Sequence, residues 1–218
     1  MKKLIGLCLL LMLLTIPSYA AITKSVAAVD EWAAVSQNAV REGAEIVVSG
    51  NYSTTLHIDI AVTSATTHDG TKIDVEASSK ATGDDNWTTI LSIIGPRGTA
   101  NPEALGGAES AGATVLEVAS TTGYEADGTR WVFILDNVVA TSELVKLVSH
   151  VGNTSVTTLD GTATDHDASD TLYSIAATLI PITITINYSR IRVIYDNTYD
   201  SGGSQVHTRC RLSRTTKL

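Results

Sequence analysis

The stretch LHIDIAV, residues 56–62, decides the fold class. Its branched aliphatic residues stand at every second position and alternate with His57, Asp59 and Ala61. Successive side chains of a β-strand point to opposite faces, so this period of two predicts a strand with one fully apolar face. The stretch therefore predicts a β-strand that buries Leu56, Ile58, Ile60 and Val62 on one face.

Segments of the same character continue on both sides of this stretch. They are 45–49, 72–77, 87–94, 114–118, 130–135, 142–151, 155–159, 171–174, 179–188, 190–195 and 205–212. Turn residues separate them, and Asp69-Gly70 is a hairpin signal. Residues 26–40 also allow a short amphipathic helix, with a strand and loop as the alternative. The chain is predicted to be all-β.

A break in the pattern divides the chain. Residues 95–112 are rich in glycine and small side chains and show no period. Two domains follow from this: a β-sandwich, and a small β-barrel-like domain inserted into it. The sandwich is predicted to comprise 44–95 and 178–218, and the inserted domain 108–176, with 21–43 as an N-terminal lead segment. A plain tandem of two domains is the alternative.

The first twenty residues differ in kind from the rest. Lys2 and Lys3 precede the apolar run Leu4–Ile16, and small residues stand at Ser18 and Ala20. This is the pattern of a secretory signal peptide over residues 1–20, and the apolar run is shorter than a membrane span. The alternatives are an uncleaved anchor and a buried strand. We expect an exported protein, periplasmic, extracellular or at the cell surface, with no other membrane association.

Composition excludes some classes of function. The 218 residues carry 15 Lys and Arg against 23 Asp and Glu, and 44% are hydrophobic while only 17% are charged. This is enough apolar material for a core, and the net charge of −8 argues against nucleic acid as a partner. Once Cys8 leaves with the signal peptide, Cys210 cannot form an internal disulfide. We expect it to be buried, with an intermolecular link as the alternative.

No motif for catalysis or cofactor binding stands out. The sequence contains no HExxH, CxxC, GxSxG, P-loop or GxGxxG pattern. We therefore predict a protein that is not an enzyme and has no cofactor and no metal site. His57 and His207 occupy the outward register of their strands and are expected to be solvated.

The most acidic segment is Asp160–Asp170. Asp165, Asp167 and Asp170 offer carboxylate oxygens for a hard cation such as calcium, but the order of an EF-hand loop is absent. The favoured interpretation is a turn whose side chains bind their own backbone.

Positive charge gathers near the C-terminal end. Arg190, Arg192, Arg209 and Arg211, with Arg214 beyond them, lie in the last two predicted strands. If these strands pair, the arginines share one outward face. Such a face could simply be solvated; the alternative is that it binds an acidic protein partner, including a neighbouring copy of the chain.

Aromatic residues suggest a second function. Trp32, Trp131 and several tyrosines are candidates for a sugar-stacking platform, although packing in the core is favoured for most of them, and Trp87 is expected to anchor the core. A secreted carbohydrate-binding module or adhesin is therefore the alternative function, and a secreted hydrolase is a third.

Residues 112–168 resemble a small β-module common in tailed-phage virion and tail-associated proteins and in related metagenomic sequences. The likeness lies in GATVLEVASTTGY (112–124), WVFI (131–134), ATSELVKLV (140–148) and VGNTSVTTL (151–159). The flanking segments resemble the sandwich that carries this module. The resemblance implies a structural or attachment role without chemistry. The predicted function is therefore non-enzymatic protein–protein assembly, in a virion or on an exported surface.

Overall fold

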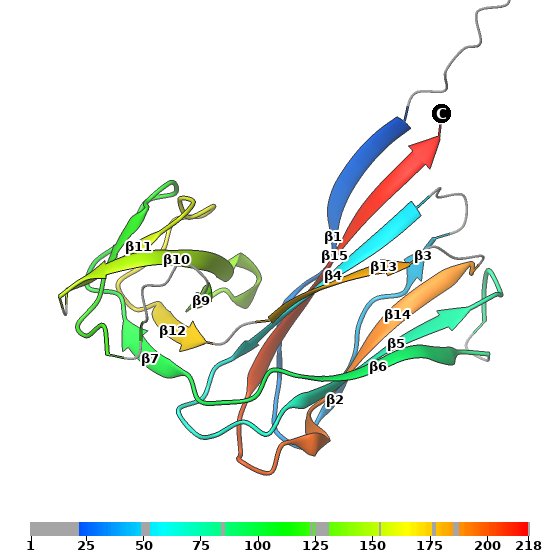
Figure 1. Cartoon of the computed structure of the whole chain (residues 1–218), viewed down its shortest axis with the longest axis horizontal. Coiled ribbons are helices and arrows are strands. Elements are labelled where there is room, and N and C mark those ends of the chain that lie inside the picture. Colours follow the sequence, from blue (N-terminus) through cyan, green and yellow to red (C-terminus); the bar gives the residue numbers. More distant parts are fainter. Residues whose placement is uncertain are drawn as a thin grey trace, which may run out of the picture.

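The structure is a computed structural model that describes residues 22–48, 53–83, 86–122, 124, 131–152, 154–175, 178–184 and 188–217 (Figure 1). These residues form antiparallel strands and two short 3-10 helices, with no α-helix among them. The all-β prediction is confirmed. No helix in the described ranges is long and apolar enough to cross a membrane. The predicted signal peptide, residues 1–20, lies outside the described residues.

The first sheet has four strands. In order across the sheet they are β1 (Ile22–Val35), β15 (Val206–Lys217), β4 (Ser53–Val62) and β13 (Thr178–Ile184). β4 contains the stretch LHIDIAV, and its Leu56, Ile58 and Ile60 are fully buried. The alternation predicted for this strand is confirmed on its inner face.

The second sheet packs against the inner face of the first. Its strands, in order, are β2 (Val40–Glu42), β14 (Arg190–Asp196), β5 (Thr71–Ser78) and β6 (Thr88–Gly95), and β3 (Ile46–Val47) also pairs with β14. Ile73, Val75, Ile191 and Val193 join the residues of β4 in one hydrophobic core. Apolar burial of this kind is the main stabilising contribution in a sandwich.

The N-terminal segment belongs to this sandwich. β1 pairs with β15 from Ile22↔Lys217 to Val35↔Val206, with register shifts after Ala28 and Asp30. β2 pairs with β14. The helical alternative for residues 26–40 is therefore wrong, and 21–43 is not a lead segment outside the sheets. Pairing with a long neighbouring strand outweighs the weak helical period of this alanine-rich stretch.

A separate six-stranded sheet is built from the middle of the chain. Its order is β7 (Asn101–Ala104), β12 (Thr171–Ile175), β9 (Trp131–Leu135), β10 (Glu143–Val151), β11 (Ser155–Thr158) and β8 (Val115–Glu117). The sheet curves until its two edges meet at the Leu105–Val118 bridge. Leu116, Ile134, Leu147 and Leu172 fill its own core. We call this lobe the barrel; β7 lies before residue 108, where we expected the inserted domain to begin.

The barrel contacts the sandwich through Phe133. Phe133 is fully buried, and its ring centroid lies 4.7 Å from that of Trp32 on β1 and 5.6 Å from that of His207 on β15. Val139 of the 3-10 helix η1 (Val139–Thr141) packs against the same hydrophobic cluster. Aromatic pairs add about 0.5–1.5 kcal/mol beyond the area they bury. One aromatic side chain of the barrel thus packs on the outer face of the first sheet and joins the hydrophobic cluster of the sandwich.

This contact explains a wrong prediction about histidine. His207 does occupy the outward register of β15, but it is only 2% exposed because the barrel covers that part of the sheet. Its Nδ1 lies 2.9 Å from Thr63 Oγ1, and burial lowers the pKa of His207 to about 4. His57, on the same outer face, is half-buried. An alternating pattern identifies a face, but not what covers it.

Cys210 lies inside the sandwich. The thiol is free and buried, and burial raises its pKa to about 12. This environment is the one predicted for a small buried residue on a strand.

Candidate functional site

The four C-terminal arginines do not share a face. β14 and β15 lie in different sheets, so the pairing on which the predicted basic face rests is wrong. Arg190 is 4% exposed, and it donates to Glu45 Oε2 at 2.5 Å and to the Lys80 carbonyl at 3.0 Å. Arg192 donates to Glu76 Oε2 at 2.7 Å and also binds Glu42. The charge of this pair is neutralised within the second sheet.

The other two arginines converge on one carboxylate. Asp59 on β4 is 0% exposed, and its Oδ2 accepts from Arg209 Nε at 2.9 Å and from Arg211 Nε at 3.1 Å. A buried carboxylate needs such partners, because an unpaired charge costs several kcal/mol to bury. Arg209 also lies over the Trp32 ring, 4.6 Å from its centroid. These arginines hold the outer face of the first sheet together.

The two tryptophans nearest these arginines do not form a sugar platform. Trp32 is 3% exposed. Trp87, expected in the core, is half-buried beneath two guanidinium groups, 4.8 Å from that of Arg190 and 4.3 Å from that of Arg192. The guanidinium groups lie where a sugar ring would stack.

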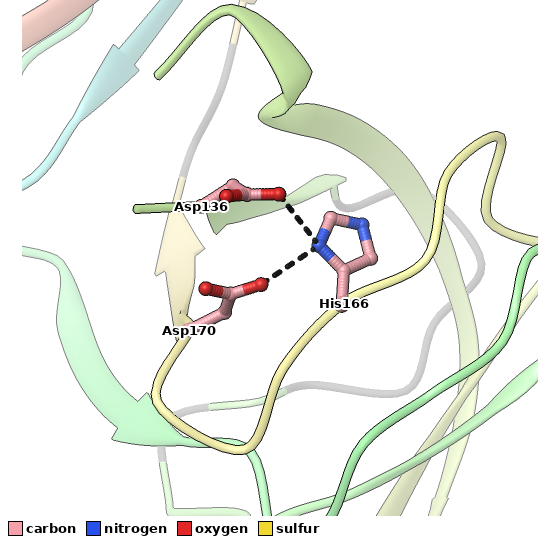
Figure 2. Close-up of side chains that lie close together, drawn as sticks. All are labelled: Asp136, His166 and Asp170. Carbon is pink, nitrogen blue, oxygen red and sulfur yellow. Dashed lines mark hydrogen bonds and ion pairs between the residues drawn. The ribbon is translucent and has the colours of Figure 1, made fainter. Parts of the chain in front are cut away.

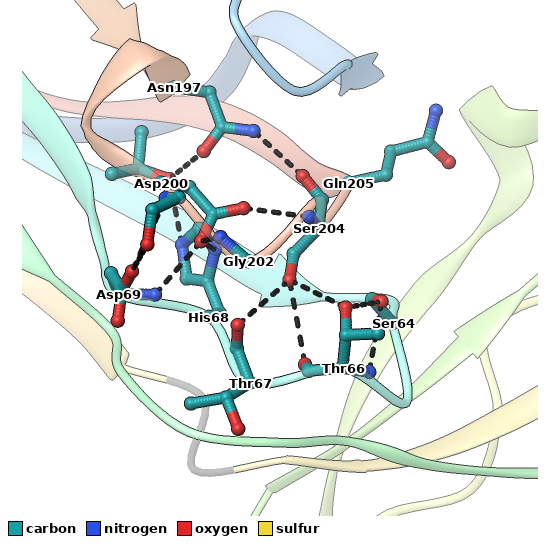
Figure 3. A network of polar contacts seen from close by, with 12 residues as sticks. Ser64, Thr66, Thr67, His68, Asp69, Asn197, Asp200, Gly202, Ser204 and Gln205 are labelled. Atoms are coloured by element: carbon teal, nitrogen blue, oxygen red, sulfur yellow. Dashed lines mark hydrogen bonds and ion pairs between the residues drawn. The ribbon is translucent and has the colours of Figure 1, made fainter.

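A polar cluster connects two loops at one end of the sandwich (Figure 3). His68 Nδ1 lies 3.4 Å from Asp200 Oδ1, and His68 Nε2 lies 3.1 Å from Thr71 Oγ1. Thr71 donates its proton to Asn197 Oδ1 at 3.0 Å. Its hydroxyl therefore accepts from His68 and cannot donate to it. The cluster has the residue types of a catalytic triad, but its hydroxyl is fully buried and its proton points away from the base.

The contacts in Figure 3 instead connect two loops, one containing Asp69 and the other containing Asp200 and Ser204. Asp200 accepts from the backbone N–H groups of Asp69, Gly202 and Ser204. Burial alone would raise the pKa of Asp200, but these donors and His68 together lower it. Burial lowers the pKa of His68. The network joins residues far apart in sequence and fixes the turn that precedes β5.

A second histidine cluster lies at one end of the barrel (Figure 2). His166 Nδ1 is 3.1 Å from Asp170 Oδ2 and 3.8 Å from Asp136 Oδ2, and its Nε2 is 2.9 Å from Glu143 Oε1. The imidazole is 0% exposed. Asp136 follows β9, Glu143 begins β10, and the other two residues precede β12. Strand ends remote in sequence thus bring three carboxylates to one ring.

These contacts shift the ionisation of the cluster. Burial alone would lower the pKa of His166, but its hydrogen bonds to Glu143 and Asp170 outweigh burial and raise it. Burial would likewise raise the pKa of Glu143, yet donation from His166, Ala163 and Thr164 lowers it to about 2. The hydrogen bond between His166 and Glu143 therefore favours the charged form of both partners.

The triplet considered for calcium is not assembled. Asp165 Oδ1 accepts from the Ala111 N–H at 2.7 Å, Asp167 is exposed, and Asp170 accepts from the N–H groups of Asp167 and Asn137. The bond between the Asp167 N–H and Asp170 is the one expected of a turn, whereas Ala111 and Asn137 belong to other parts of the chain. The residues that could hold a metal are instead Asp136, His166 and Asp170, whose ligand atoms all lie within 4.8 Å of one another.

A pocket of about 450 Å³ lies beside the Leu105–Val118 bridge, where the two edges of the barrel sheet meet. Leu105, Val115, Val118 and small residues line it, and Glu117 is its one ionisable lining residue. A single carboxylate among aliphatic side chains offers no set of converging catalytic groups.

Comparisons with known proteins give weak matches. No protein-family model and no curated protein matches the chain. Among solved structures it is similar to the SPBc2 prophage-derived protein YomS, at 11% identity over 86% of this chain and 95% of that chain. It is also similar to VP17, a capsid protein of bacteriophage P23-77, at 8% identity over 91% and 98%, and to the VP16–VP17 complex of that phage's two major capsid proteins, at 8% over 89% and 99%. The TM-score is 0.20 in all three cases, too low to assign a fold or a role.

Proposed function

We propose that this protein is a non-enzymatic structural or attachment protein that acts through protein–protein assembly, with a second copy of the chain as its partner. The observation that carries the proposal is the edge of the first sheet. β1 is 14 residues long, and among the described residues it pairs with β15 alone. Strands usually have 3–10 residues, and an open edge of this length is a template for another strand.

The two edges of this sheet differ. β13 contains Pro181, which lacks the N–H that an added strand would use. In β1 the segment Ile22–Ala28 pairs regularly with β15 and contains one charged residue, Lys24. In Figure 1, β1 is the outermost strand of the sheet, beside β15. Charged residues and proline normally protect edges. Ile22–Ala28 is therefore the stretch open to strand addition.

A second copy fits this edge by symmetry. Two β1 strands related by a twofold axis run antiparallel, and each presents the same backbone groups to the other. The two four-stranded sheets would then continue as one. Pairing through the backbone provides affinity without a deep pocket.

The barrel offers a second contact surface away from the sandwich. Val115, Val148, Val151 and Leu159 lie on or next to β8, β10 and β11, and they are 49%, 39%, 62% and 58% exposed. Aliphatic side chains gathered on one sheet face favour contact with protein. We assign this face to further contacts in the assembly.

The setting of the assembly is part of the proposal. The predicted signal peptide favours an exported protein at a cell surface, whereas the resemblance of residues 112–168 to phage modules favours a virion. Capsid or tail genes beside the gene for this protein would decide for the virion, and N-terminal sequencing of exported material beginning at Ala21 would decide for the surface.

A pair of proline variants tests the assembly. Ser25 and Val26 are neighbours in the regularly paired part of β1, so one N–H points to β15 and the other to the open edge. Of Ser25→Pro and Val26→Pro, one should leave the thermal unfolding temperature nearly unchanged and convert the assembled protein to monomers in light scattering. The other should lower the unfolding temperature. A wild-type protein that is monomeric at all concentrations, or assembly unchanged in both variants, would contradict the proposal.

A further inference from the structure

We propose that Asp136, His166 and Asp170 form a binding site for a divalent transition-metal ion, with Glu143 as a positioning residue behind the imidazole. Figure 2 shows both aspartates approaching the same ring nitrogen of His166 from one side. The inference is independent of the assembly proposed above, because it concerns the end of the barrel and not the β1 edge.

The distances fit ligands that share one ion. Zinc–nitrogen and zinc–oxygen bonds are about 2.0–2.2 Å long, so two ligand atoms on one ion lie roughly 3.0–3.4 Å apart at octahedral or tetrahedral angles. His166 Nδ1 lies 3.1 Å from Asp170 Oδ2 and 3.8 Å from Asp136 Oδ2. All three ligand atoms lie within 4.8 Å of one another, so small side-chain rotations suffice to place them around one ion.

Glu143 supplies the support that a metal-binding histidine needs. A histidine that binds a metal through one nitrogen usually donates its other N–H to a carboxylate, which sets the tautomer and the ring orientation. Here Nε2 of His166 is 2.9 Å from Glu143 Oε1. Glu143 is itself held by the N–H groups of Ala163 at 2.7 Å and Thr164 at 2.9 Å. Nδ1 is therefore the nitrogen presented to the ion.

The two aspartates are also held in place. Asp136 Oδ1 accepts from the Val138 N–H at 2.7 Å, which leaves Oδ2 directed toward His166. Asp170 accepts from the N–H groups of Asn137 at 3.3 Å and Asp167 at 3.0 Å, and its side chain is 1% exposed. Ligands fixed by backbone donors lose little entropy when an ion binds.

The charge of the cluster calls for a cation. Three carboxylates surround one imidazole, and among the described residues no lysine or arginine is ion-paired with Asp136, Glu143 or Asp170. A divalent ion held by the lone pair of His166 Nδ1 and the two aspartates would offset two of the three negative charges that these carboxylates carry.

The donor set selects the class of ion. Imidazole nitrogen suits zinc, iron, nickel and copper, whereas calcium prefers six to eight oxygen ligands. A site that offers one imidazole and two carboxylates therefore favours zinc or a similar first-row ion over calcium. The Asp-rich loop therefore contributes one carboxylate and one imidazole to the site, and its other acids take no part.

Titration of the tag-free full chain with Co²⁺ and Zn²⁺, followed by absorption and calorimetry, tests the site. We expect one ion per chain, with Co²⁺ bands that Zn²⁺ abolishes and Ca²⁺ does not. His166→Gln and Asp170→Asn should each weaken binding at least tenfold, and Glu143→Gln about tenfold. Asp167→Asn, which changes an exposed carboxylate of the same loop, should bind as the wild type does. Substoichiometric binding, or ligand variants that bind like the wild type, would overturn the proposal.

A second measurement covers variants that fail to fold. Circular dichroism in EDTA shows whether each variant is folded. X-ray absorption of the Zn²⁺-loaded wild type needs no variant and should show one imidazole among nitrogen and oxygen ligands. A shell without imidazole would overturn the assignment.

Discussion

The strands of the sandwich and the end of the barrel neutralise their carboxylates in different ways, although the sandwich loops also contain one buried pair of a histidine and a carboxylate, His68 and Asp200. In the sandwich Asp59 has two arginines, and Asp30 has Arg41 at 2.6 Å. At the end of the barrel Asp136, Glu143 and Asp170 share one histidine. Arginine stays charged at every physiological pH, whereas an imidazole can give up a proton and bind an ion. The difference suggests a permanent scaffold in one lobe and a site for an exchangeable cation in the other.

Removal of the aromatic contact between the lobes should have the largest effect. Phe133→Ala deletes a fully buried ring of the barrel that joins the hydrophobic cluster of the sandwich. Such truncations cost about 3–5 kcal/mol. Denaturant unfolding should show this loss, and limited proteolysis should cut the links between the lobes faster. Val148→Ala, an exposed position on β10, is the control and should change little.

Acid should weaken the same contact. The pKa of His207 is about 4 in the folded protein against 6.5 for the free side chain. Between these values the unfolded chain binds more protons, so stability is complete above pH 6.5 and falls as the pH drops toward 4. The full effect approaches roughly 3 kcal/mol.

A histidine variant isolates this contribution from those of other titrating groups. Unfolding curves at pH 7.5, 6.5, 5.5 and 4.5 should fall less steeply for His207→Gln than for the wild type. His150→Gln, at an exposed histidine of β10, should keep the wild-type slope. If stability fell equally steeply with pH in all three proteins, His207 would not be a source of the acid sensitivity.

The matched acid variants sharpen the comparison between the lobes. Asp59→Asn leaves two arginines without their carboxylate, and loss of charged hydrogen bonds should cost about 2 kcal/mol. In metal-free buffer, Asp136→Asn removes one of three carboxylates around His166 and should change stability by less than about 0.5 kcal/mol, because relief of repulsion offsets the lost attraction to the imidazolium. If urea unfolding showed that Asp59→Asn and Asp136→Asn lower the free energy of unfolding equally, the proposed difference between the two lobes would be wrong.

The sequence predicted the positions of strands more reliably than which strands pair and which surfaces become covered. Alternation placed Leu56, Ile58 and Ile60 in the core because the period of two is a property of the strand itself. It could not place His207, because the barrel that covers it comes from elsewhere in the chain. Asp69-Gly70 indicated a hairpin, yet β4 and β5 lie in different sheets, because a turn signal sets the local backbone and not the strand's next partner.

The candidate metal site shows the same limit. Asp165, Asp167 and Asp170 are close in sequence and were the set considered for a cation. Asp136 lies after β9, and only the pairing of β9 with β12 brings it to the loop that holds His166 and Asp170. Spacing along the chain contains no trace of that pairing. The prediction of one shared arginine face was wrong for a related reason, because β14 and β15 are consecutive strands but lie in different sheets.

Hydrogen exchange of the β1 amides tests the proposed assembly most directly. In Ile22–Ala28 alternate N–H groups face β15 and the open edge, so a monomer should show alternate slow and fast exchange. We predict that the fast amides become protected as protein concentration rises, while the amides of β13 do not change. Edge amides of β1 that exchange rapidly at every concentration would contradict assembly through this strand.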